Sequence, residues 1–213
     1  MSSVAVIDYG MGNLHSIAKA LQHADTSATV LITADVAQLK SADRIVFPGV
    51  GAMRDCLKAL ASYELTDTIK ELAQTKPFLG ICLGMQALLT VSEEHTESEG
   101  LNIIPGQVVR FNEGMHDADG HLLKIPHMGW NQVKQITHPL WANIADTSRF
   151  YFVHSYYAKP NDTSTVIATA DYPTPFACAL AKNNLFAVQF HPEKSQAAGL
   201  QLLKNFLLWD GQF

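Results

Sequence analysis

Cys82 is the residue with the clearest chemical potential in this sequence. Residues 80–84 read GICLG, so the cysteine follows an apolar run and has a glycine two positions away on either side. This spacing is typical of a nucleophile elbow, a strand-to-helix turn that strains the backbone of the nucleophile. We expect the positive end of a helix beneath the sulfur and an oxyanion donor in the Leu83 N–H. A buried structural cysteine is the alternative that this motif alone leaves open.

A thiolate nucleophile needs a base and a group that orients the base, and residues 190–194, FHPEK, offer both. His191 and Glu193 are two positions apart in a segment that we expect to be extended, so their side chains leave the same face. Pro192 favours extended backbone at His191. We therefore predict a triad of Cys82, His191 and Glu193. The alternative for the second motif is an exposed turn that closes a strand.

A second glycine-rich loop follows another apolar run, where residues 48–51 read PGVG. Glycine allows backbone N–H groups to approach a ligand closely. We expect one of Gly49, Val50 and Gly51 to provide the second oxyanion donor, although an ordinary turn between a strand and a helix fits the loop alone equally well.

Cofactor and metal chemistry have little support. The first glycine-rich turn, residues 10–15, has His15 where a dinucleotide-binding loop needs its third glycine. His127 and His154 lie in apolar segments and are expected to be buried. Cys56 and Cys178 are also expected to be buried, and the spacing of the cysteines matches no zinc ribbon. We predict no cofactor and no metal.

The elements around these motifs alternate in the first half of the chain and become strand-rich in the second. Apolar strands are predicted over residues 4–8, 28–33, 44–48 and 77–81, with helical patterns ending at 20 and covering 52–63, 66–74 and 83–91. Strands are then predicted over 102–112, 131–136, 150–158, 165–170 and 176–190, the last with a hairpin at Asn183-Asn184, before a helix over 197–209. These patterns predict an α/β fold with a mixed sheet, helices on both faces and an antiparallel extension, in one domain over residues 1–213.

Composition excludes some classes of function. The 213 residues include 15 Lys and Arg and 20 Asp and Glu, a net charge of −5, so we expect no nucleic-acid binding. No apolar stretch approaches the roughly 20 residues that span a bilayer, and the first residues do not predict a signal peptide. The odd number of cysteines predicts no disulfide framework, and we expect a cytoplasmic protein.

Six motifs in this order resemble the class I (triad) glutamine amidotransferases, which have a flavodoxin-like fold. Within that family they are most similar to the glutaminase subunits of imidazole glycerol phosphate synthases. The motifs are DYGMGNL at 8–14, PGVG at 48–51, GICLGMQ at 80–86, HMGWN at 127–131, YFVHSY at 151–156 and FHPEKS at 190–195.

The resemblance implies that Cys82 attacks the carboxamide of glutamine and that Gln86, Ser155, Tyr156 and, less directly, Glu94 contact this substrate. It also implies a partner, a separate (βα)₈-barrel cyclase subunit that receives the ammonia in a heterodimer. Trp130 and Lys194 are the expected interface residues. Three alternatives remain open: a glutaminase of the pyridoxal phosphate or purine pathways, a catalytically silent regulator, and a cysteine peptidase on the same fold.

Overall fold

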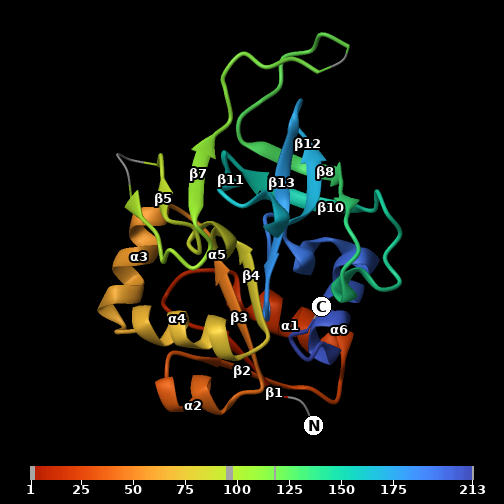
Figure 1. Ribbon diagram of the computed structural model, residues 1–213. Coiled ribbons are helices and arrows are strands. Elements are labelled where there is room, and N and C mark those ends of the chain that lie inside the picture. The colour runs from red at the N-terminus through yellow and green to blue at the C-terminus, as the bar shows by residue number, and fades with distance from the viewer. Residues whose placement is uncertain (1–2, 95–97, 118, 213) are drawn as a thin grey trace.

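The main sheet joins a parallel half to a largely antiparallel half (Figure 1). The computed structural model describes residues 3–94, 98–117 and 119–212. The parallel half contains, in spatial order, β2 (Thr29–Thr33), β1 (Ser3–Ile7), β3 (Arg44–Gly49), β4 (Phe78–Cys82) and β14 (Leu185–Val188). The sheet continues through β13 (Pro175–Lys182), β11 (Tyr156–Pro160), β7 (Gly106–Arg110), β5 (Val91–Ser92) and β6 (Ser98–Glu99). Of these neighbours, β5 and β7 pair in parallel, and the others pair antiparallel.

Two smaller strand groups complete the second half of the chain. β12 (Val166–Asp171) pairs with β13 and with β9 (Lys134–Gln135). β8 (His127–Gln132) and β10 (Arg149–His154) form a separate antiparallel sheet. The described residues also form 3₁₀ turns: η1 (Pro139–Trp141) follows β9, η2 (Thr163–Thr165) precedes β12, and η3 (Pro192–Lys194) follows β14.

Helices cover both faces of the parallel half because its strands alternate apolar side chains between two cores. Val4 and Val6 of β1 join the core under α1 (Leu14–Ala24) and α6 (Gln196–Leu208). Ala5 and Ile7 join the core under α2 (Val36–Ser41), α3 (Met53–Ser62) and α4 (Thr66–Thr75). The predicted α/β fold, with its mixed sheet, antiparallel extension and helices on both faces, is confirmed.

The predicted hairpin near the end of the chain is present and carries its second strand into the parallel half. Asn183 takes a left-handed conformation (φ +53°) in the turn between β13 and β14. β14 then pairs in parallel with β4, and Val188 lies opposite Ile81. This register places the residues after β14 next to Cys82.

The helix predicted over residues 83–91 is wrong in length, because α5 ends after four residues (Leu83–Gln86). Beyond it, the carbonyls of Ala87, Leu88 and Leu89 accept hydrogen bonds from the backbone of Leu101, Asn102, Ile103 and Ile104. A distant segment thus takes the acceptors that a longer helix would use, and tertiary contacts override the local pattern. No helix of the described residues is long and apolar enough to cross a membrane.

Candidate active site

Cys82 sits at a strained corner between β4 and α5. Its backbone has φ +55° and ψ −111°, a conformation that a residue with a side chain rarely adopts. Close packing holds the corner, since a Cβ added at Gly84 would lie 2.0 Å from the Phe47 carbonyl oxygen of β3. The strained elbow expected from the GICLG motif is therefore present. The shortness of α5 makes its dipole weaker than the sequence suggested.

His191 and Glu193 form a buried pair beside this corner. His191 Nδ1 is 2.9 Å from Glu193 Oε1, and the side chains are 3% and 1% exposed. His191 has the expected extended backbone, but Glu193 lies in the 3₁₀ turn η3 and not in extended chain. Pro192 favours this turn because its fixed φ suits the first position of a helix.

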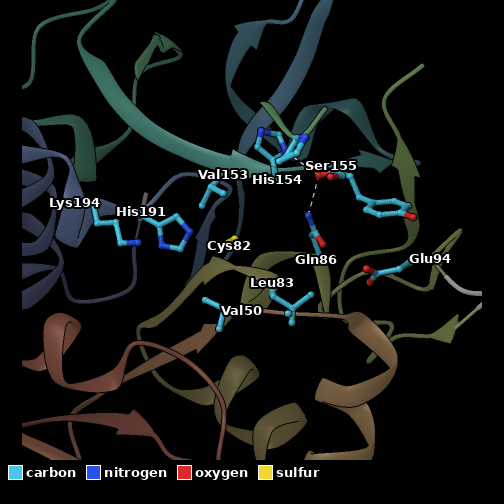
Figure 2. A pocket seen from close by; sticks show the side chains of 13 residues that line it. Val50, Cys82, Leu83, Gln86, Glu94, Val153, His154, Ser155, His191 and Lys194 are labelled. Atoms are coloured by element: carbon cyan, nitrogen blue, oxygen red, sulfur yellow. Dashed lines mark hydrogen bonds between the residues drawn. The ribbon is translucent and has the colours of Figure 1, made fainter. Parts of the chain in front are cut away.

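The second nitrogen of His191, Nε2, makes no hydrogen bond to a described residue, and the ring is directed toward the Cys82 sulfur (Figure 2). Burial alone would lower the pKa of His191, but the proximity of Cys82 and Glu193 outweighs burial and raises it to about 10. The raised pKa favours the protonated imidazole, the form that can act as an acid.

A pocket of about 320 Å³ opens over the sulfur (Figure 2). This volume lies within the range of small-molecule sites. The predicted site residues that line it are Val50, Gly51, Cys82, Leu83, Gln86, Glu94, Ser155, Tyr156, His191 and Lys194. The structure thus brings the nucleophile, the base and all four predicted substrate contacts to one cavity.

Two of the predicted substrate contacts, Gln86 and Glu94, already make hydrogen bonds within the protein. The Gln86 side-chain Nε2 donates to the Tyr156 carbonyl oxygen at 2.9 Å, and this oxygen also lies 2.8 Å from His154 Nδ1. Glu94 Oε2 accepts a hydrogen bond of 2.6 Å from the Met53 N–H at the start of α3. Glu94 therefore caps a helix as well as lining the pocket.

The sequence reasoning missed one residue that contacts the nucleophile. The Gln189 side chain is fully buried, and its Nε2 lies 3.7 Å from Cys82 Sγ. Its Oε1 accepts a 2.9 Å hydrogen bond from Gln86 Nε2. Gln189 precedes His191 by two positions. The reasoning that placed His191 and Glu193 on one face of an extended segment could therefore also have placed Gln189 on that face.

The predicted oxyanion segment is fixed at one end and open at the other. Gly49 pairs with Cys82 across β3 and β4, and the Tyr9 hydroxyl donates to the preceding Pro48 carbonyl at 2.7 Å. Val50 is 41% exposed, and Gly51 has φ +92°. Leu83 begins α5, where backbone N–H groups have no acceptor within the helix.

The predicted interface residues both lie beside Tyr151, and Lys194 also lines the pocket. Trp130 of β8 is 43% exposed and stands edge-on to Tyr151 of β10, with 6.0 Å between ring centroids. Lys194 Nζ lies 5.8 Å from the centroid of the same Tyr151 ring. Met128, also on β8, is 62% exposed.

The remaining candidate metal ligands and nucleophiles are either exposed or buried in the apolar core. Asp117, Asp119 and His121 have ligand atoms within 4.8 Å of one another, but they are largely exposed in the long loop between β7 and β8 (Figure 1). His127 and His154 are buried as predicted, and burial lowers their pKa values to about 4 and about 3. Cys56 and Cys178 are buried, as predicted.

Replacing Glu193 by glutamine should lower both the pKa of His191 and the turnover of the site. The carboxylate helps to raise the pKa of His191, so its loss shifts the titration of that ring to lower pH. A less well-oriented imidazole should reduce the kcat of the site by about 10- to 100-fold. NMR titration of the His191 ring and steady-state kinetics test this. E113Q, on an exposed carboxylate paired with Arg110, is the control, and an unchanged His191 titration in E193Q would contradict the prediction.

Comparison with known proteins identifies the family. The family model described as Glutamine amidotransferase class-I matches residues 5–209. The chain is 63% identical over 212 residues to imidazole glycerol phosphate synthase subunit HisH of Methylococcus capsulatus, a match that covers 99% of this chain and 98% of that one. It is 53% identical to subunit HisH 1 of Pseudomonas aeruginosa, over the whole of both chains.

The chain belongs to the class I glutamine amidotransferases. Within this family it is a HisH-type glutaminase, the type that serves imidazole glycerol phosphate synthase in histidine biosynthesis. This identification favours the HisH type over the glutaminases of the pyridoxal phosphate and purine pathways.

Solved structures agree on the fold of this HisH-type chain. A putative GMP synthase component from Thermoplasma acidophilum superposes with a TM-score of 0.69 at 20% identity, covering 97% of this chain and 92% of that one. A crystal structure described as glutamine amidotransferase gives a TM-score of 0.71 at 16% identity, covering 96% and 97% of the two chains.

Proposed function

We propose that this HisH-type chain hydrolyses glutamine through Cys82, His191 and Glu193 and passes the ammonia to a separate cyclase subunit. The observation that supports this most directly is the placement of a strained cysteine and a buried, carboxylate-bound imidazole in one pocket.

In the first step, the Cys82 sulfur attacks the side-chain carboxamide carbon of glutamine. The negative charge passes to the carboxamide oxygen, which the Leu83 N–H and one N–H of Gly49, Val50 or Gly51 stabilise. The C–N bond then breaks, and protonated His191 gives its proton to the departing nitrogen, so that ammonia and a γ-glutamyl thioester form. The raised pKa of His191 suits it to this acid role.

In the second step, His191 is neutral and takes a proton from water as the water oxygen adds to the thioester carbon. The C–S bond breaks, glutamate leaves, and the sulfur departs as a thiolate. Glu193 keeps the ring oriented in both steps. Gln86, Ser155, Tyr156 and Glu94 contact the substrate, and the reaction requires no cofactor or metal.

The partner that we propose is a (βα)₈-barrel cyclase subunit in a one-to-one heterodimer. The surface formed by Trp130, Met128 and Lys194 suits it, because exposed aromatic and apolar side chains are typical of interfaces and Lys194 also lines the pocket. We place this complex in the cytoplasm, where the free cysteines Cys56, Cys82 and Cys178 would remain thiols.

We expect the glutaminase to be slow until the barrel docks and binds its nucleotide substrate. Val50 and Gly51 line the pocket, and Val50 is 41% exposed, so a docked subunit can contact this segment and complete the oxyanion site. Glutamate release should rise by at least about 100-fold when the barrel and its ligand are added, because one oxyanion donor contributes about that much. Equal rates with and without the barrel would contradict this coupling.

A catalytically silent regulator is the remaining alternative, and covalent trapping separates the two. An oxo-norleucine electrophile that resembles glutamine should alkylate Cys82 in the complex with the barrel. Mass spectrometry of the digested protein locates the adduct, and Cys56 and Cys178 in the same sample serve as internal controls because neither lines the pocket. Absence of an adduct on Cys82 would favour the regulator.

A further inference from the structure

Gln189 is a buried polar residue that the proposed mechanism does not use. It directly follows β14, and its backbone N–H donates to the Cys178 carbonyl oxygen at 2.9 Å. The parallel register of β14 and β4, with Val188 opposite Ile81, then puts Gln189 beside Cys82. The side chain is 0% exposed, so each of its polar atoms needs a partner inside the protein.

The hydrogen bonds around Gln189 fix which end of its amide faces the sulfur. A backbone carbonyl only accepts, so the Gln86 atom bonded to the Tyr156 oxygen must be the amide nitrogen. That nitrogen also donates to Gln189, whose bonded atom must therefore be the oxygen Oε1. The NH₂ group of Gln189 is left to face Cys82 Sγ, 3.7 Å away. A flipped amide would place nitrogen against nitrogen and oxygen against sulfur.

We propose that Gln189 is a further residue of the catalytic machinery, whose amide N–H holds the Cys82 sulfur in position. Gln189 Nε2 donates to this sulfur at 3.7 Å, and the ring of His191, two positions further along the chain, is directed toward the same sulfur (Figure 2). A hydrogen bond to a charged acceptor is stronger than one to a neutral acceptor. The contact therefore helps most when the sulfur is negative, before the attack on glutamine and again when the thioester breaks. This inference rests on the proposed role of Cys82 as nucleophile.

Three substitutions separate a role of the donor from a role in packing. Q189M keeps the length of the side chain and removes both polar atoms. Q189E keeps an oxygen for the Gln86 bond but replaces the N–H that faces the sulfur. Q189N keeps the amide but moves it away from the Cys82 sulfur, because asparagine is one methylene shorter. It is the mildest of the three changes and provides a folded variant if the others do not fold. Thermal unfolding of each full-length variant establishes that it is folded.

Two measurements report on the sulfur. We expect all three variants, in complex with the cyclase subunit, to lose about 10- to 100-fold in kcat for glutamine, while KM stays within about threefold. The rate at which iodoacetamide alkylates Cys82 in the full chain at one fixed pH should fall by about 10-fold, as measured by mass spectrometry. A residue that only fills space would leave both rates unchanged in Q189M.

The outcomes distinguish this inference from its alternatives. Normal kcat and normal alkylation in the folded variants would overturn it. A raised KM in Q189M together with normal kinetics in Q189E would also overturn it, because Gln189 would then act only by holding Gln86. The proposed glutaminase function is judged separately, on the unsubstituted protein. If that protein hydrolyses glutamine and the Gln189 variants match it, only this inference fails.

Discussion

Replacing Cys82 by alanine should reduce glutamine hydrolysis by at least about 1,000-fold, because no other side chain in the pocket can form the thioester. The complex should still make product from added ammonium, since in the proposed function the cyclase subunit and not Cys82 carries out the second reaction. Parallel assays with glutamine and with ammonium as the nitrogen source measure both activities.

The matched control is Cys178→Ala, which removes another buried thiol that does not line the pocket and leaves the backbone carbonyl that binds Gln189 in place. We expect it to cost about 1–2 kcal/mol of stability and to keep glutamine turnover within a few-fold of the original. If C82A retained glutamine-dependent turnover, Cys82 could not be the nucleophile.

Replacing Gly84 by alanine should damage the site almost as severely without removing any catalytic group. The new Cβ would lie 2.0 Å from the Phe47 carbonyl oxygen and 2.9 Å from its carbonyl carbon, so the corner at Cys82 must move away from β3. A displacement of about 1 Å at a catalytic group can cost about 100-fold in rate. We expect at least that loss in kcat, with about 2–4 kcal/mol lost in the free energy of unfolding.

Gly120→Ala tests whether this loss is specific. Gly120 also has a positive φ, +83°, but apart from its chain neighbours no described atom lies within 4 Å of an added Cβ. It should cost only about 1 kcal/mol of backbone strain and leave kcat unchanged. Denaturant unfolding and glutaminase assays on both variants make the comparison, and normal kcat in G84A would show that the corner tolerates movement.

The sequence predicted the parallel half of the fold well because its signals are local. The apolar runs before Pro48 and Cys82 become β3 and β4, and the Asn183-Asn184 turn becomes the hairpin that brings β14 beside β4. The GICLG spacing also predicted the corner at Cys82, because glycines are needed where backbones approach closely.

Features that depend on distant contacts were harder to predict. The shortness of α5 results from hydrogen bonds to a segment more than ten residues later, which no local pattern shows. Glu193 lies in a 3₁₀ turn and not in the predicted extended chain, because Pro192 favours extended backbone before it but a helical turn after it. Gln189 was missed because its contacts come from pairing with β4, a strand far away in the sequence.

Among the candidate site residues, too, local spacing predicted some pairs, whereas others depend on contacts between distant segments. The spacing of His191 and Glu193 was sufficient to pair them, whereas their proximity to Cys82 depends on the order of strands in the sheet. Likewise, Trp130 and Lys194 meet across Tyr151 only because β8 pairs with β10.

The late position of β14 in the chain has a consequence for biosynthesis. Cys82 and Gln189 are 107 positions apart, and His191 comes later still, so a nascent chain has its thiol long before its acid and base. Until this last strand has left the ribosome and paired with β4, the Cys82 thiol lacks His191, the group that we propose as acid and base. We therefore expect a partly made chain to hydrolyse no glutamine.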